Sequence, residues 1–105
     1  MAVELPKTPV GRHLGWLLEA LRGAPSPDEV KRRFSPTYLR QTPAETLVQI
    51  IELRGGELKG FVLDRYEREA QRELVAILAT PDGRESRLAL AVDDQRITRM
   101  TIATV

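Results

Sequence analysis

The sequence contains no cysteine and a single histidine, His13. These absences exclude structural disulfides, thiolate metal sites and any metal site built from several histidines. Only 5% of the residues are aromatic, so a core must consist mainly of Leu, Val, Ile and Ala. No apolar run approaches the roughly 20 residues that span a bilayer, and the first residues lack the pattern of an export signal. We therefore expect no membrane partner, no cofactor and, by default, a cytoplasmic chain whose compartment is otherwise unknown.

The charges are nearly balanced, with 16 basic and 15 acidic residues and a formal net charge of +1. A protein that neutralises nucleic-acid phosphates needs a larger positive excess, so a nucleic-acid partner is not expected. The basic run Lys31-Arg32-Arg33 is typical of a solvated helix face. The 105 residues, 42% of them hydrophobic and 30% charged, predict one folded domain over residues 1–105.

The first half is marked by four hydroxyl residues that each precede a proline. This arrangement is typical of a helix cap followed by the first helical residue. Two of the four also have a glutamate three positions after the cap, Ser26 with Glu29 and Thr42 with Glu45, which predicts capping boxes. Glycines are placed to end the first and last helices, at Gly23 and Gly55-Gly56. The predicted elements are helices over 9–22, 27–34 and 43–54, with at most a turn or two over 35–41.

The second half predicts strands. Residues 72–105 read as three strands, joined by turns at Pro81-Asp82-Gly83 and at Asp93-Asp94. Residues 58–66 and 74–79 alternate as two neighbouring strands, but Phe61 to Leu78 also fits one continuous helix. We favour strands, because the following hairpin then gains a partner and the sheet has four strands. The predicted fold class is α+β, with three N-terminal helices packed on a curved antiparallel four-stranded sheet.

Several local patterns resemble a known family. They are the run Phe34 to Leu39, the segment Thr42 to Glu45, the turn Pro81 to Arg84 leading into Arg87 to Val92, and Arg96 to Thr98. Together they resemble the N-terminal domain of β-lactamase-related serine hydrolases of the type associated with clavulanic acid biosynthesis. That domain is similar to the cystatin-like, nuclear-transport-factor-2-like superfamily, which includes steroid isomerases and polyketide cyclases. The resemblance implies a cone between helices and sheet that commonly holds a ligand.

The hydrolase activity does not carry over, because no serine here has the Ser-x-x-Lys spacing of the nucleophile in those hydrolases. We therefore expect a non-catalytic domain of this type that serves dimerisation or small-molecule binding. The alternative is a free-standing isomerase, cyclase or hydratase that acts on a hydrophobic small molecule. No residue is assigned a catalytic or metal-binding role, and whether the chain is an enzyme stays open.

Four residues are candidate ligand contacts. Trp16 and Tyr38 have large amphipathic rings that suit a pocket or an interface, although such rings also fill cores. Asp64 and Tyr66 share strand parity and could project into the same space, unless they belong to a solvated sheet end. His13 could act as a general base, but a partly exposed position near a helix start is the simpler interpretation.

Both faces of the strand 74–79 are apolar, whereas the helices can cover only one. We therefore predict a homodimer that buries the odd-numbered set Val75, Ile77 and Ala79, or the even-numbered alternate. Replacement of Ile77 by arginine should dissociate or destabilise the protein under either assignment.

Overall fold

The computed structural model describes residues 3–23 and 25–105. Within these residues four helices precede four strands, so the predicted α+β class is confirmed. The helices are α1 (Pro9–Arg22), α2 (Pro27–Arg33), α3 (Pro36–Gln41) and α4 (Ala44–Glu57). The strands are β1 (Val62–Glu69), β2 (Glu73–Ala79), β3 (Glu85–Val92) and β4 (Ile97–Thr104).

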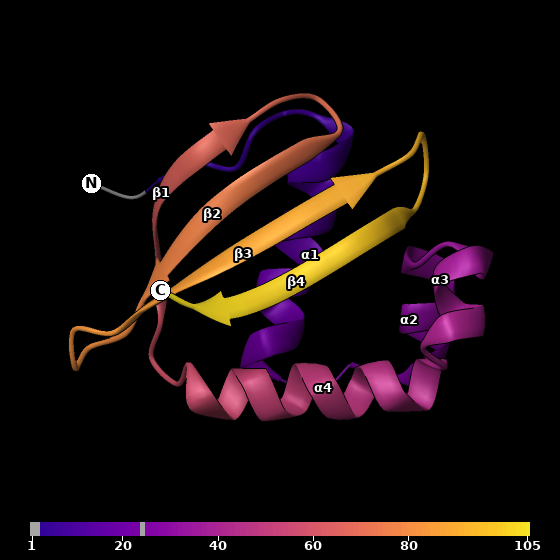
Figure 1. Ribbon diagram of the computed structural model, residues 1–105, viewed down its shortest axis with the longest axis horizontal. Helices are drawn as coiled ribbons and strands as arrows, with labels where there is room; N and C mark the ends of the chain where they lie inside the picture. Colours follow the sequence, from indigo (N-terminus) through magenta and orange to yellow (C-terminus); the bar gives the residue numbers. More distant parts are fainter. Residues whose placement is uncertain (1–2, 24) are drawn as a thin grey trace.

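The strands form one curved antiparallel meander in the order β1-β2-β3-β4. The four-stranded prediction is therefore confirmed, and the alternative of one continuous helix from Phe61 to Leu78 is wrong. Figure 1 looks onto the face of the sheet that carries no helix, called the open face below. α1 crosses behind the sheet, α4 runs below β4, and α2 and α3 lie beside the start of β4.

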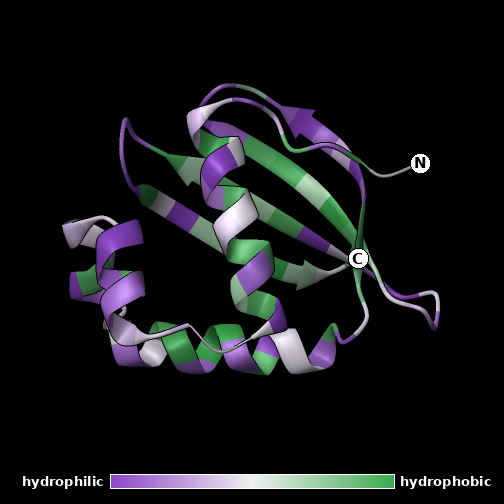
Figure 2. Ribbon diagram, turned by 180° about the vertical axis from the view of Figure 1, so that it is seen from behind, coloured by the Kyte–Doolittle hydropathy of each residue, from purple (hydrophilic) through white to green (hydrophobic). Residues whose placement is uncertain are grey.

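The two faces of β2 differ in what covers them. Leu74, Ala76 and Leu78 are buried in the hydrophobic core beneath the helices, together with apolar residues of β3 and β4. Val75, Ile77 and Ala79 alternate with them and therefore lie on the open face. Seen from behind, α1 lies across the strands (Figure 2). Of the odd-numbered set, Val75 and Ala79 are partly exposed on this face, whereas Ile77 is buried.

α1 has the predicted boundaries for the predicted reasons. The Thr8 side chain accepts a hydrogen bond from the Gly11 amide, and Pro9 opens the helix. Leucines recur along one stripe of α1, and Leu14 and Leu17 are completely buried in the core. The sequence pattern therefore fixed both the limits of this helix and the face it presents to the sheet.

α4 does not end where its glycines predicted. The helix passes through Gly55 and Gly56 to Glu57, so the expected stop at Gly55-Gly56 is wrong. A Cβ atom on Gly55 would lie 2.1 Å from the carbonyl oxygen of Leu21 in α1, whereas one on Gly56 would meet nothing within 4 Å. Gly55 therefore allows two helix backbones to touch. The chain turns only at Gly60, which has a φ of +81°.

The predicted caps are confirmed at Ser26 and wrong at Thr42. Ser26 Oγ accepts a hydrogen bond from the Glu29 amide at 3.1 Å. Thr42 instead ends α3, because its amide donates to the Tyr38 carbonyl, and α4 starts after Pro43 without a side-chain cap. Residues 36–41 form a short helix of six residues capped by Ser35, in agreement with the expected turn or two.

Both predicted turns between strands are confirmed. Gly83 has a φ of +88°, the left-handed conformation that glycine adopts without strain. The Asp93 carboxylate accepts hydrogen bonds from the amides of Gln95 and Arg96, each at 2.8 Å. These bonds lower the pKa of Asp93, and they confirm its local structural role in the turn.

Candidate functional site

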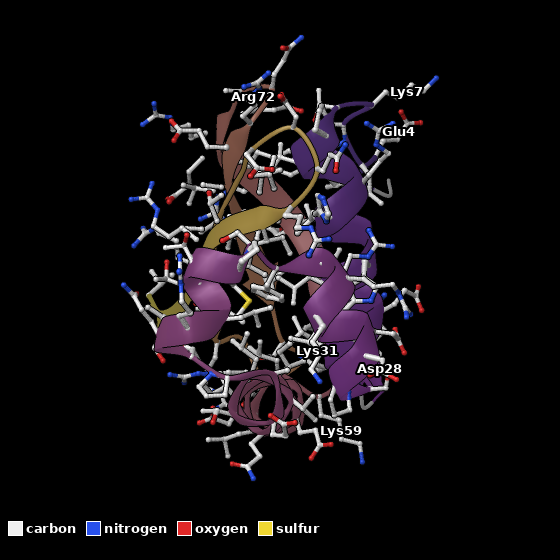
Figure 3. The ribbon with its side chains drawn as sticks, turned by 90° about the vertical axis from the view of Figure 1, so that its right-hand side faces the viewer. Glu4, Lys7, Asp28, Lys31, Lys59 and Arg72 are labelled. Atoms are coloured by element: carbon white, nitrogen blue, oxygen red, sulfur yellow. The ribbon has the colours of Figure 1, made fainter. Side chains whose placement is uncertain are left out.

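The space between helices and sheet is filled by apolar side chains. The fully buried side chains that fill this space include Leu14, Leu17, Phe34, Leu47, Ile51, Leu74, Leu78, Leu88, Leu90 and Ile97. Figure 3 looks edge-on between the two layers, and the labelled charged residues, such as Asp28, Lys59 and Arg72, lie on the outside. A hollow of about 50 Å³ lies at one end of the layers, beside Arg54, Ser86 and Ile102. It has room for a few water molecules, but not for a hydrophobic substrate.

Trp16 and Tyr38 both pack against Phe34. The Trp16 ring centroid is 6.1 Å from that of Phe34, and the Tyr38 centroid is 5.3 Å from it. Trp16 Nε1 donates to a Glu29 carboxylate oxygen at 3.2 Å, which is the main reason that the pKa of Glu29 is lowered. Tyr38 donates to the Met100 carbonyl at 3.4 Å, and its burial raises its pKa. Tyr38 therefore joins α3 to β4, and Trp16 joins α1 to α2.

Asp64 and Tyr66 lie in β1, at the opposite edge of the sheet. The ladder to β2 has an irregularity between Leu63 and Arg65, so Asp64 is the extra residue of a β-bulge. Asp64 forms an ion pair with Arg65, and Tyr66 donates to the Glu4 carbonyl at 2.9 Å. The four candidate residues therefore form two separate pairs, one at each edge of the sheet, and not a single site.

His13 is more buried than the sequence predicted. It is 7% exposed, and its Nε2 lies 2.9 Å from the Gln95 carbonyl oxygen in the turn between β3 and β4. Nδ1 is buried without a hydrogen-bond partner among the described residues. Burial is the main cause that lowers the pKa of His13, and nearby Arg33 and Arg12 lower it further. The expectation of a partly exposed His13 is wrong, because the imidazole is buried between α1 and this turn and contacts the Gln95 carbonyl.

The open face carries ion pairs that span β2. Arg65 in β1 lies 3.0 Å from Glu85 in β3, and Arg87 in β3 lies 2.6 Å from Glu67 in β1. Both arginines are in register with Ile77, which lies between them and is 0% exposed. Their aliphatic stems cover Ile77 while their charged ends pair above it. The Arg87 guanidinium also lowers the pKa of Glu67.

Beside these pairs the open face has a shallow hollow of about 80 Å³ with a small-residue floor. Val75 and Ala89 lie opposite each other in the ladder and form the floor. Arg68, Arg99 and Glu73 line its sides, with Glu73 paired to Arg68. In this strip the apolar side chains of Val75 and Ala89 stay partly accessible.

Neither a candidate metal site nor a candidate membrane-spanning helix is found among residues 3–23 and 25–105. No group of three or more His, Asp or Glu side chains there is placed to hold a metal ion. No helix in that part of the chain combines the length and apolar character needed to cross a bilayer.

Residues 5–97 match the model of the family described as ORF 12 gene product N-terminal. The chain belongs to this family. The match takes in all four helices and the first three strands, and it ends where β4 begins. A search of the curated proteins finds no match.

For this member of the ORF 12 N-terminal family, sequence reasoning missed the charged cover of the open face. The sequence does contain a signal for this charged cover. Arginine and glutamate occupy outward positions of neighbouring strands, as in Arg65, Glu85 and Arg87. Opposite charges at such positions stabilise a sheet surface, and long arginine stems can cover an apolar residue between them.

Proposed function

We propose that this chain is a non-catalytic accessory domain of the nuclear-transport-factor-2-like type, which associates with a second copy through the open face of its sheet. It would be similar to the domain that precedes the catalytic domain in β-lactamase-related serine hydrolases. The description of its family as the N-terminal part of a gene product supports an accessory role.

The filled interior is the observation that carries the non-catalytic part of this proposal. An enzyme acting on a hydrophobic small molecule needs a pocket of some hundreds of Å³ with a few convergent polar groups. Between the helices and the sheet, where the resembled superfamily commonly holds its ligand, the hollow is about 50 Å³. A larger groove lies at the β1 edge of the sheet, but its one carboxylate, Asp64, is already paired with Arg65. The one histidine has its Nε2 at the Gln95 carbonyl and its Nδ1 buried, so neither nitrogen is placed to reach a substrate.

The open face supports the choice of a second copy as partner. It has no helix over it, and Val75, Ala79, Ala89 and Ala91 are partly exposed there. It also carries both signs of charge in mixed positions, in the pairs of Arg65 with Glu85 and Arg87 with Glu67. In a two-fold interface a residue away from the axis lies opposite a different residue of the other copy, so a surface with both signs of charge can pair with itself.

Light scattering after size exclusion, over concentrations from low to high micromolar, tests the proposal. We expect a dimer that Ala89→Glu and Ala89→Arg both convert to a monomer, because Ala89 lies between Val75 and Thr101 at the centre of the open face. The two substitutions introduce opposite charges. If both abolish the dimer, the size of the new side chain disrupts the interface, whichever charge it carries. Gln49→Glu and Gln49→Arg, on the exposed side of α4, are the matched controls and should stay dimeric. A wild-type chain that is monomeric throughout refutes self-association.

Ile77→Arg is a poor test of association. Ile77 is 0% exposed in the isolated chain, because Arg65 and Arg87 already cover it. An arginine at this position would disturb the folded monomer as well as any dimer. The expectation that this substitution destabilises the protein follows from the structure, but it does not report on a partner.

A further inference from the structure

A groove lies at the β1 edge of the sheet, away from the centre of the open face and outside the space between the layers. It has a volume of about 470 Å³ and is bounded by the N-terminal segment, α1 and the start of β1. Its lining includes Leu5, Leu18, Val62 and Leu63, with Arg22 and Asp64 as its charged residues. A volume of this size is within the range of small-molecule sites in proteins.

The wall formed by the N-terminal segment is held in place. The Glu4 carbonyl accepts a hydrogen bond from the Tyr66 hydroxyl at 2.9 Å. A Cβ atom on Gly11 would lie 1.9 Å from the Pro6 carbonyl oxygen, so the absence of a side chain there lets the segment lie directly on α1. Leu5 reaches Gly15 in the same way, with its Cδ1 3.0 Å from the position of a Cβ atom. The groove is therefore formed before any ligand arrives.

The walls leave apolar surface accessible. Leu5 is 42% exposed and Val62 is 57% exposed, which places both among the most accessible large hydrophobic residues in the described part of the chain. Leu18 is buried in the core and Leu63 packs against that core, so both continue the apolar surface inward. A ligand with an apolar body would bury the exposed parts of Leu5 and Val62 and gain the free energy of that burial.

The charges of the groove are not equivalent. Asp64 is already paired with Arg65. Arg22 has no carboxylate within 4.0 Å among the described residues, and its Cζ lies 4.6 Å from the centroid of the Phe61 ring. A guanidinium that lies over an aromatic ring keeps N–H groups at its edge that can donate to a ligand. The unpaired charge of the groove is therefore positive, and it is a planar donor that suits one carboxylate.

We propose that this groove binds a small amphiphilic monocarboxylate, whose carboxylate pairs with Arg22 and whose apolar body lies on Leu5, Leu18 and Val62. This goes beyond the proposed self-association, because it involves a different surface and a small-molecule partner. It also gives Tyr66 a positioning role, since its hydroxyl holds the wall of the groove, and places Asp64 at the polar rim.

Titration of ¹⁵N-labelled protein with octanoate tests the proposal. We expect amide shifts at Leu5, Leu18 and Leu63, and an affinity for octanoate clearly higher than for octylamine or octanol at the same chain length. Arg22→Gln should lower the octanoate affinity about tenfold or more, because it removes a charge-assisted hydrogen bond. Arg22→Lys should bind with intermediate affinity, because it keeps the charge without the planar fork. Arg12→Gln, an exposed position on the same helix, is the matched control and should leave binding unchanged.

Other outcomes would overturn the assignment. Octylamine or octanol binding as tightly as octanoate would show that Arg22 does not select the ligand. Shifts spread over the open face, or no shifts up to the solubility limit of octanoate, would show that the groove is not the site. The amide spectrum of each variant reports whether it is folded, so a lost interaction is separated from lost structure. The oligomeric state is measured on the same samples. A dimer that does not bind octanoate would refute the groove proposal alone, and a monomer that binds octanoate would refute self-association alone.

Discussion

The two adjacent glycines of α4 give opposite predictions for the same substitution. Alanine at Gly55 must place its Cβ 2.1 Å from the Leu21 carbonyl oxygen and 3.0 Å from the Leu21 carbonyl carbon. Alanine at Gly56 meets nothing within 4 Å. Both positions are helical, so the gain in helix propensity is shared, and the contact with α1 decides the difference.

The magnitudes follow from that contact. Both clashing atoms at Gly55 belong to backbone, so α1 and α4 must move apart by on the order of 1 Å before ordinary van der Waals contact is restored. Overpacking of this kind costs about 1–3 kcal/mol, and we expect the upper end because no side chain can rotate away. After the propensity gain of about 1 kcal/mol, Gly55→Ala should lose about 2 kcal/mol. Gly56→Ala should gain about 0.5–1 kcal/mol.

Thermal and urea unfolding of both variants measures these values. For a domain of this size about 1 kcal/mol corresponds to a shift of about 4–8 °C in Tm, so Gly55→Ala should lower Tm by roughly 10 °C and Gly56→Ala should raise it by a few degrees. Gly55→Ala with wild-type stability would refute the close approach of α1 and α4. A destabilised Gly56→Ala would instead show that this turn of α4 is not helical in solution.

Two further predictions concern His13 and the helix caps. Burial lowers the pKa of His13 in the folded chain below its ordinary 6.5, so as pH falls through about 6.5 the unfolded chain takes up a proton that the folded chain does not. In urea unfolding between pH 7.5 and 5.5, the free energy of unfolding should therefore decrease as the pH is lowered. The decrease should be smaller in His13→Gln. Equal dependence on pH in the two proteins would contradict this reasoning. Ser26→Ala should cost about 1 kcal/mol, because Ser26 caps α2, whereas Thr42→Ala should stay within about 0.5 kcal/mol in the same assay. If Thr42→Ala lost more stability than Ser26→Ala, the conclusion that Ser26 caps a helix and Thr42 does not would be wrong.

Local signals predicted much of the fold. The Thr8-Pro9 cap and the leucine stripe gave α1 its observed limits, and alternation gave the strands. The errors arose where a contact that the local pattern does not reveal decided the outcome. Gly55 looked like a helix end because its own neighbours do not show that Leu21 of α1 lies against it. Thr42 looked like a cap because the sequence does not show that its amide completes α3.

The candidate site was less predictable for the same reason. Trp16 and Tyr38 were singled out by residue type, and only the folded structure shows that both pack against Phe34. Asp64 and Tyr66 were joined by strand parity, but a β-bulge at Asp64 interrupts the ladder. The groove near Arg22 depends on the N-terminal segment lying on Gly11 and Gly15, an arrangement with no periodic signal.

The cover over Ile77 changes what the apolar pattern of β2 implies. Alternation counts Ile77 as apolar surface in need of a partner, but the stems of Arg65 and Arg87 bury it within the chain. The apolar surface left on the open face is the strip around Val75 and Ala89, rimmed by charges, and Val62 at the β1 edge, opposite Ala79. A sheet-to-sheet dimer must therefore gain much of its affinity from charge complementarity, which salt screens at exposed sites. Dissociation should increase with salt concentration, and a dimer insensitive to salt would point to a different, more apolar interface.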